Sequence, residues 1–280
     1  MLCLALAVFA ISGCQSLHDQ FREPPPKQDQ VAPAPRDAAR SAHLPFGNPS
    51  TATADPGNED NFLMVGEGSV ISYNNTRGTA NWAAWRTTRD DLADSIRRPD
   101  FRSDPRLPRW YKRIGPFDYA GSGYDRGHLV PSADRFANPR LNVETFMMTN
   151  IVPQSRSLNQ YPWNDFEQYV RAQVRKGFDA YQIAGVYGEA GRIKGKISAP
   201  TNCWKVVVLL PRGAEPASIN ERARVLAIDV PNENGLEHEK WMRFRTSAKA
   251  IEQRTGLDLF SSLPLDLQRE LETRTETVSR

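Results

Sequence analysis

One histidine stands among charged residues in the segment Asp125-Arg126-Gly127-His128. An imidazole can take a proton from water near neutral pH, because its unperturbed pKa is about 6.5. The guanidinium of Arg126 adds a permanent cation of the kind that stabilises an anionic transition state. Histidines beside an Asp-Arg pair are also commonly structural. His128 is nevertheless the best candidate in this chain for a general base.

A second polar group follows this segment, and it consists of Asn150, Asn159 and Glu167. At 100° per residue, Asn159 and Glu167 lie within a quarter-turn of each other on one helix face, so both can face one point. An amide oxygen can hold Mg²⁺ while leaving most of its octahedral shell to water and a substrate phosphate. The alternative is that the two asparagines are turn or cap residues and that the glutamate is solvated.

Taken together, these segments resemble the DNA/RNA non-specific endonuclease family, which includes the Serratia-type secreted nuclease and mitochondrial endonuclease G. The resemblance rests on the ordered combination of several motifs and extends over roughly residues 62–265. The segments that carry it are residues 125–128, 149–154 and 158–160 with Glu167, and the framework segments 81–85, 203–206 and 251–257.

The resemblance implies an α+β architecture of the ββα-metal (His-Me finger) type, with a central antiparallel sheet flanked by helices. Two strands and a helix would hold one divalent ion. His128 would be the general base, and Asn159 the one direct protein ligand of Mg²⁺, for which Mn²⁺ could substitute. Arg126, Asn150 and Glu167 would contact phosphate, orient His128 or order metal-bound waters. The products of this family carry 5′-phosphates.

Further arginines upstream are candidates for substrate binding. The family resemblance predicts a phosphate contact at Arg97 or Arg98, and the sequence does not distinguish the two. Residues 82–113 contain nine basic and five acidic side chains, an excess that fits either a nucleic-acid backbone or a solvated face. Phosphate contacts carry no sequence information, and no base-reading motif is present. Cleavage of DNA and RNA with little sequence preference is therefore expected.

Hydrophobic patterning predicts the elements that must position these residues. Residues 62–65, 70–73 and 81–86 read as strands with a turn at 74–78, and 181–186, 203–210 and 225–230 read as buried strands. Apolar residues at helical spacing predict a helix over 163–174, and residues 248–255 form a short helix between Ser247 and Gly256. We expect one domain over residues 61–267 and a polar tail over 268–280.

The first sixty residues have a different composition. Residues 1–14 resemble a signal peptide that ends in a lipobox-like Ile-Ser-Gly-Cys, so Cys14 would receive a lipid and anchor the protein to a membrane. Residues 15–60, which include His43, are rich in proline and alanine and are expected to form a disordered tether. The chain has three cysteines, too few and too scattered for a disulfide scaffold or a Cys-rich zinc site. Cys203 is expected to be a small core residue.

Composition limits the function classes. The 280 residues carry a net charge of only +3, so affinity for a polyanion must come from local clustering. The sequence predicts an exported, envelope-associated lipoprotein, or otherwise a periplasmic or secreted protein, that acts as a Mg²⁺-dependent endonuclease. A catalytically silent nucleic-acid-binding lipoprotein and a phosphodiesterase of small nucleotides are the alternatives. Nothing in the sequence indicates an oligomeric state.

Overall fold

The computed structural model describes residues 40, 42–94 and 98–275. An antiparallel sheet of six strands forms its centre, in the order β1-β2-β3-β6-β9-β10. Its strands are β1 (Phe62–Val65), β2 (Val70–Asn74), β3 (Thr79–Thr87), β6 (Phe178–Tyr187), β9 (Asn202–Pro211) and β10 (Arg224–Pro231). All six strands predicted from the sequence are present in this sheet.

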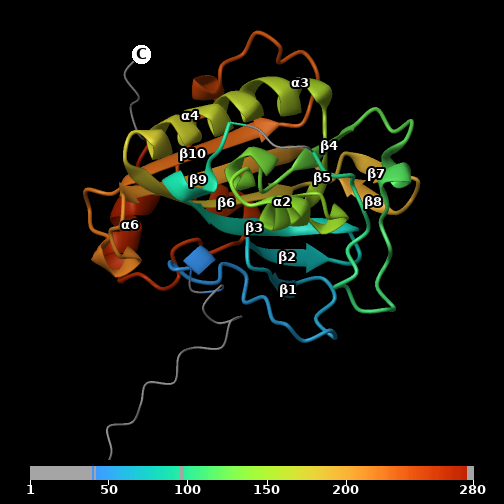
Figure 1. Ribbon diagram of the computed structural model, residues 1–280, viewed down its shortest axis with the longest axis horizontal. Coiled ribbons are helices and arrows are strands. Elements are labelled where there is room, and N and C mark those ends of the chain that lie inside the picture. The colour runs from blue at the N-terminus through green and yellow to red at the C-terminus, as the bar shows by residue number, and fades with distance from the viewer. Residues whose placement is uncertain (1–39, 41, 95–97, 276–280) are drawn as a thin grey trace, which may run out of the picture. The chain divides into compact units, whose positions relative to one another are not determined.

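Among the described residues, two short strand pairs and the helices α2 to α6 accompany the sheet (Figure 1). The pairs are β4 (Asp125–His128) with β5 (Ile151–Gln154), and β7 (Gly191–Ile193) with β8 (Ile197–Ala199). The helices are α2 (Pro139–Thr145), α3 (Arg156–Leu158), α4 (Asn164–Arg175), α5 (Ala248–Thr255) and α6 (Leu265–Thr273). The architecture is therefore α+β, as expected.

Side-chain alternation along the strands divides the core into two layers. On β3, Ala83 and Trp85 face one core, whereas Trp82 and Ala84 face the other. The first core is completed by the apolar face of α4, and Figure 1 shows this helix lying along the sheet. The second core includes residues of α5 and α6. Both faces of the sheet are therefore covered.

The predicted short helix near the C-terminus forms with the expected start and end. The Ser247 hydroxyl accepts a hydrogen bond from the Ala250 N–H at 3.2 Å, which caps α5. Gly256 ends the helix with φ of 72°, a left-handed conformation that glycine adopts at no steric cost. These signals were local, and this explains why the sequence revealed them.

The helix after β5 begins earlier than predicted. Its first residues form α3, where the Ser155 hydroxyl accepts a hydrogen bond from the Leu158 N–H at 3.2 Å. The backbone then widens into a π-helical turn over Asn159–Trp163 before α4 follows. Pro162 lies inside this turn, and its missing N–H removes one helical hydrogen bond there. The wide turn carries Asn159 toward the end of the β4–β5 pair.

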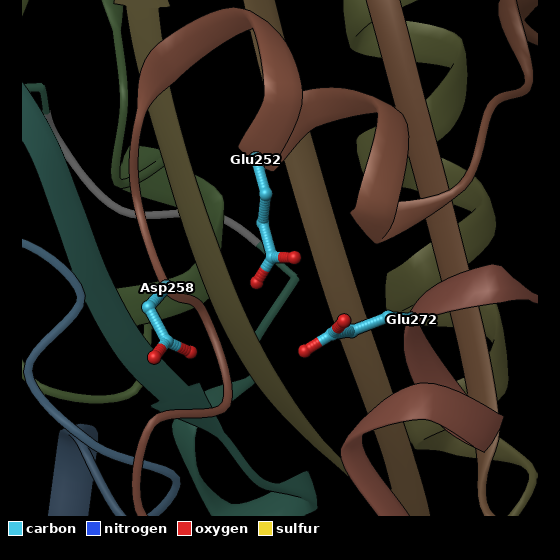
Figure 2. Close-up of side chains that lie close together, drawn as sticks. All are labelled: Glu252, Asp258 and Glu272. Carbon is cyan, nitrogen blue, oxygen red and sulfur yellow. The ribbon is translucent and has the colours of Figure 1, made fainter. Parts of the chain in front are cut away.

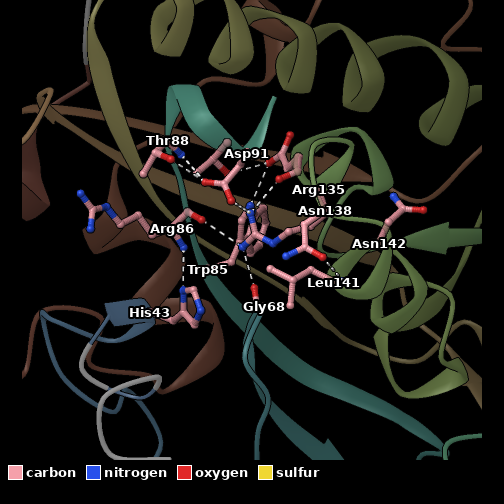
Figure 3. A network of polar contacts seen from close by, with 12 residues as sticks. His43, Gly68, Trp85, Arg86, Thr88, Asp91, Arg135, Asn138, Leu141 and Asn142 are labelled. Carbon is pink, nitrogen blue, oxygen red and sulfur yellow. Dashed lines mark hydrogen bonds and ion pairs between the residues drawn. The ribbon is translucent and has the colours of Figure 1, made fainter. Parts of the chain in front are cut away.

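The predicted boundary of the tether at residue 60 is wrong. Residues from 42 onward belong to the folded domain, because Phe46 and Ala52 are buried in the second core. His43 fixes this segment to β3, as Figure 3 shows. Its Nδ1 accepts from the Arg86 N–H at 3.1 Å, and its Nε2–H donates to the Glu67 carbonyl at 2.8 Å. Burial lowers the pKa of His43 to about 4, so the ring is neutral in this role.

The predicted polar tail also begins too early. Helix α6 continues to Thr273, Leu271 is fully buried in the second core, and Glu272 pairs with Lys249 at 3.0 Å. A few apolar side chains in an otherwise polar sequence are enough to order each of these two segments on an existing sheet face.

The predicted signal peptide, with Cys14, lies outside the described residues. Within the part that the structure describes, no helix is long and apolar enough to cross a membrane. Cys203 is fully buried, in agreement with its expected role as a core residue, and burial raises the pKa of its thiol to about 12.

Candidate active site

A cleft of about 1030 Å³ opens where the β4–β5 pair meets the helix that follows it. Most of the polar residues singled out in the sequence line this cleft, although they are separated by up to seventy positions in the chain. Those residues are Arg98, Arg126, His128, Asn159 and Glu167.

His128 is presented by the last position of β4, opposite Ile151 of β5. Its ring packs between Phe101 and Phe146, with centroid distances of 5.4 and 5.0 Å. Its Nε2 is buried and has no hydrogen-bond partner among the described residues. Burial, aided by the charge of Arg98, lowers the pKa of His128 to about 4. The imidazole is therefore neutral at pH 7 and able to accept a proton.

Gly127 explains why the strand can approach its partner so closely. A Cβ atom at this position would lie 2.0 Å from Oε1 of Gln154 and 2.6 Å from its Cγ. The Gln154 side chain is fully buried and has little room to move. Only glycine therefore fits between Arg126 and His128.

Asn159 reaches the cleft with a fixed carboxamide. Its Nδ2 donates to Oδ2 of Asp125 at 3.0 Å, and Gln160 donates to the same oxygen at 3.2 Å. Because a carboxylate only accepts hydrogen bonds, the nitrogen must face Asp125 and the oxygen must point away from it. No described residue donates to Oδ1 of Asn159. This free, oriented amide oxygen suits a hard divalent cation such as Mg²⁺, which binds few protein ligands and retains water.

Glu167 follows Asn159 further along the chain, in α4, and its carboxylate is held by buried cations. Lys205 donates from Nζ to its Oε1 at 3.0 Å, and Arg171 lies 3.9 Å from its Oε2. The Lys205 side chain is 0% exposed, and its ammonium lies 4.5 Å from the centroid of Trp163. Burial raises the pKa of Glu167, whereas the charges of Lys205 and Arg171 oppose that rise. The carboxylate is thus positioned at the wall of the cleft.

Asn150 does not line the cleft, so of the three roles that the resemblance implies for it, its contacts fit orientation of the His128 segment rather than contact with phosphate or metal-bound water. Its Nδ2 donates to the carbonyls of Val130 and Thr145 at 3.0 and 2.9 Å. Its Oδ1 accepts from the Val130 N–H at 3.0 Å. All of these bonds go to backbone, and the residue is 1% exposed. Asn150 therefore supports the chain two residues beyond His128.

The candidate phosphate-binding arginines divide into two groups. Arg98 and Arg126 are exposed at the cleft, and the guanidinium of Arg126 lies 4.6 Å from the centroid of Phe101. Arg97 lies outside the described residues. Other cations of the basic stretch are used internally, since Arg86 pairs with Asp179 at 2.7 Å and Arg106 pairs with Asp104 at 2.7 Å. The excess of positive charge in residues 82–113 is therefore only partly available to a substrate.

Two charged residues of the site were not found from the sequence. Arg171 lines the cleft and bonds to the buried Asp134 at 3.1 Å. It follows Glu167 at i+4 on the same helix, a spacing that could have revealed it. Lys205 comes from β9, on the far side of the first core, and no local pattern links it to Glu167.

A group of three carboxylates lies elsewhere in the domain, outside the cleft. Ligand oxygens of Glu252, Asp258 and Glu272 lie within 4.8 Å of one another, and Figure 2 shows the three side chains converging. The ammonium of Lys249 donates to Glu252 at 3.1 Å and to Glu272 at 3.0 Å, so one cation of the chain already bridges the two buried members. The group adjoins the second core, whereas the cleft adjoins the first.

A strand pair and a helix that bring one histidine and one oriented carboxamide to a polar cleft define the ββα-metal class of nuclease fold. The solved structure of an EndoG/EndoGI complex has this fold in common with the chain. It superposes with a TM-score of 0.68 at 21% identity and covers 85% of this chain and 96% of that one.

Sequence comparisons identify the family. The family model for DNA/RNA non-specific endonuclease matches residues 47–266, and the chain belongs to this family. It is 38% identical to a nuclease of Nostoc sp. over 98% of this chain and 97% of that protein. It is 30% identical to the nuclease of Serratia marcescens, over 78% of this chain and 82% of that one, and 30% identical to human mitochondrial endonuclease G, over 70% and 68%.

Proposed function

We propose that this member of the family is a Mg²⁺-dependent endonuclease, with Mn²⁺ able to substitute, that hydrolyses DNA and RNA with little sequence preference and leaves 5′-phosphate ends. One observation carries the proposal. The neutral ring of His128 and the free carboxamide oxygen of Asn159 line a single cleft, on a strand and a helix that adjoin each other. Hydrolysis of a phosphodiester needs a base on one side of the phosphorus and a cation on the other.

In this mechanism His128 accepts a proton from the attacking water. Asn159 would hold the metal ion, with its amide oriented by Asp125. When bound, the divalent ion supplies positive charge for the phosphate and the departing 3′-oxygen. Arg126 binds and neutralises the phosphate, and Arg98 extends that contact along the backbone. Glu167, which accepts a hydrogen bond from Lys205, would also accept hydrogen bonds from water in the cleft.

The arrangement of the cleft supports activity on polymers without sequence preference. Its cations are positioned to contact phosphate, which is common to DNA and RNA and identical at each nucleotide. The presence of both the histidine and the asparagine argues against a silent binding protein. A cleft of about 1030 Å³ lies at the upper end of the range for small-molecule sites, and it has room for a segment of polymer.

A zymogram of the purified protein with DNA and with RNA, run with and without EDTA, tests this function. We expect cleared bands on both substrates that disappear with EDTA and return with added Mg²⁺. Comparison of rates on plasmid, RNA and a small phosphodiester separates the alternatives, because a phosphodiesterase of small nucleotides would prefer the small ester. Bands that persist in EDTA would contradict metal dependence.

Removal of the carboxamide of Asn159 should weaken metal activation. For Asn159→Ala we expect the Mg²⁺ concentration at half-maximal activity to rise about tenfold or more, as for other changes around a metal ligand. A titration of activity against Mg²⁺ measures this. Asn234→Ala, an exposed asparagine outside the cleft, is the matched control and should leave the curve unchanged. An unchanged curve for Asn159→Ala would reject its role as ligand.

We also propose that the protein is exported and carries a lipid on Cys14, because the sequence before that residue resembles a lipobox. In bacterial cells fed a labelled fatty acid, the wild-type chain should incorporate label and sediment with membranes. Cys14→Ser should lose the label and appear in the soluble fraction. Equal labelling of the two chains would contradict the lipid site, and an unprocessed chain in the cytosol would contradict export.

A further inference from the structure

One large aromatic side chain at the cleft is exposed to solvent to an unusual degree. Phe117 lines the cleft, yet it is 85% exposed. Of the four exposed large hydrophobic residues in the described part of the chain, only Phe117 lines the cleft; the others are Trp110, Tyr161 and Leu265. A phenylalanine exposed to this extent contributes nothing to the core. Its position instead offers a flat apolar face to whatever occupies the cleft.

The backbone that carries this ring is rigidly held. Phe117 belongs to a short 3-10 helix, Pro116–Tyr119, that follows Gly115. The Gly115 N–H donates to Oδ2 of Asp118 at 2.9 Å, and Lys196 pairs with Oδ1 of Asp118 at 2.9 Å. Tyr119 is buried in a third apolar cluster with residues of the β7–β8 hairpin. The ring is therefore carried by an ordered backbone segment, and stacking of a ligand on the ring would cost little entropy of ordering in the protein.

A cation, Lys194, lies directly beside the segment that carries Phe117. Lys194, between β7 and β8, donates from Nζ to the Phe117 carbonyl at 2.8 Å. It forms no salt bridge with any described residue, whereas Lys196 is paired with Asp118 and Arg192 with Glu189. Lys194 also lines a smaller hollow of about 350 Å³, together with Ser122. Figure 1 shows β7 and β8 next to the segment that leads into β4.

We propose that Phe117 is a stacking platform for a nucleobase beside the scissile phosphate, and that Lys194 binds the next phosphate of the same strand as it leaves the cleft. The proposal rests on the nuclease function above and specifies its substrate. A base can stack on Phe117 only when it is unpaired or locally unstacked from its neighbours, and every base has a face that can stack. The enzyme should therefore favour single-stranded regions without reading their sequence.

The test compares Phe117→Ala, Phe117→Trp and the control Trp110→Ala on a short single-stranded oligonucleotide and on bis(nitrophenyl) phosphate, which has no flanking base. Stacking of one base contributes about 1–3 kcal/mol, or roughly 5- to 150-fold. We expect Phe117→Ala to raise KM for the oligonucleotide by that factor and to lower the preference for oligonucleotide over the small ester. Phe117→Trp should restore the KM for the oligonucleotide. Lys194→Gln should make that KM depend less strongly on salt concentration.

Binding measured without cleavage provides an independent readout. With EDTA present, an oligonucleotide that contains 2-aminopurine should lose fluorescence on binding to wild type and to Phe117→Trp, and retain it with Phe117→Ala. An unchanged KM for Phe117→Ala, or an equal loss in Trp110→Ala, would overturn the proposal. Failure of the nuclease function would look different, because the wild-type protein would then cleave neither substrate.

Discussion

Replacing His128 with alanine should lower kcat on plasmid DNA by about 10²–10⁴-fold, the range over which a general base contributes. The fold should survive, because Nε2 of His128 has no hydrogen-bond partner among the described residues, so removal of the ring leaves no other polar group unpaired there. Affinity for nucleic acid, measured by fluorescence anisotropy in EDTA, should change little, since the arginines of the cleft remain. Kinetics and binding together therefore separate chemistry from recognition.

Two controls sharpen this experiment. His238→Ala removes a histidine outside the cleft and should leave kcat unchanged. Imidazole added to His128→Ala at high concentration should recover part of the lost rate, because it can enter the space vacated by the ring and take the proton. Wild-type turnover of the variant would reject the assignment of His128 as base, as would loss of binding equal to loss of rate.

Replacing Lys205 with methionine should cause the largest loss of stability. The change leaves the carboxylate of Glu167, whose side chain is 11% exposed, without its partner at 3.0 Å. Breaking a buried ion pair on one side costs about 3–5 kcal/mol. In a domain of this size such a loss corresponds to a fall in Tm of roughly 6–20 °C, measurable by calorimetry. Metal-activated cleavage should fall as well, because the pKa of Glu167 rises without Lys205.

The chain offers a matched control for this variant. Lys240 pairs with Asp165 of the same helix α4 at 3.6 Å, but its side chain is 73% exposed. Lys240→Met should change stability by no more than about 1 kcal/mol. The double variant Lys205→Met with Glu167→Gln should recover part of the lost stability, since it removes the stranded charge, without regaining activity. A Lys205→Met protein as stable as Lys240→Met would contradict this account of the buried pair.

Local patterns predicted much of the fold. Strands such as β9 have runs of β-branched and apolar residues, and α5 has its cap and its terminal glycine within ten positions. The segment Asp125–His128 was also recognisable, because its four residues are consecutive in the chain and together form one strand. Information of this kind does not depend on which distant segments pack against it.

The features that escaped prediction depend on long-range packing. Lys205 and Glu167 are 38 positions apart in the chain, and they come together only because α4 packs on the sheet that contains β9. Asn150 resembles a site residue by type and spacing, yet its amide is used up by backbone groups near Val130. Phe46 lies in a segment of disordered composition and is ordered by the sheet face that it covers. The composition of a segment does not show whether it will cover a sheet face formed by distant residues.

In the proposed mechanism, one divalent ion and one imidazole act on the same scissile ester from opposite sides. Crystals of the His128→Ala variant with a bound oligonucleotide and Mn²⁺ would test it through the anomalous signal of manganese. We predict one manganese site in the cleft, in contact with the carboxamide oxygen of Asn159, with a phosphate between it and position 128. Manganese at Glu252, Asp258 and Glu272 alone, or a phosphate on the far side of Asn159 from position 128, would contradict the account.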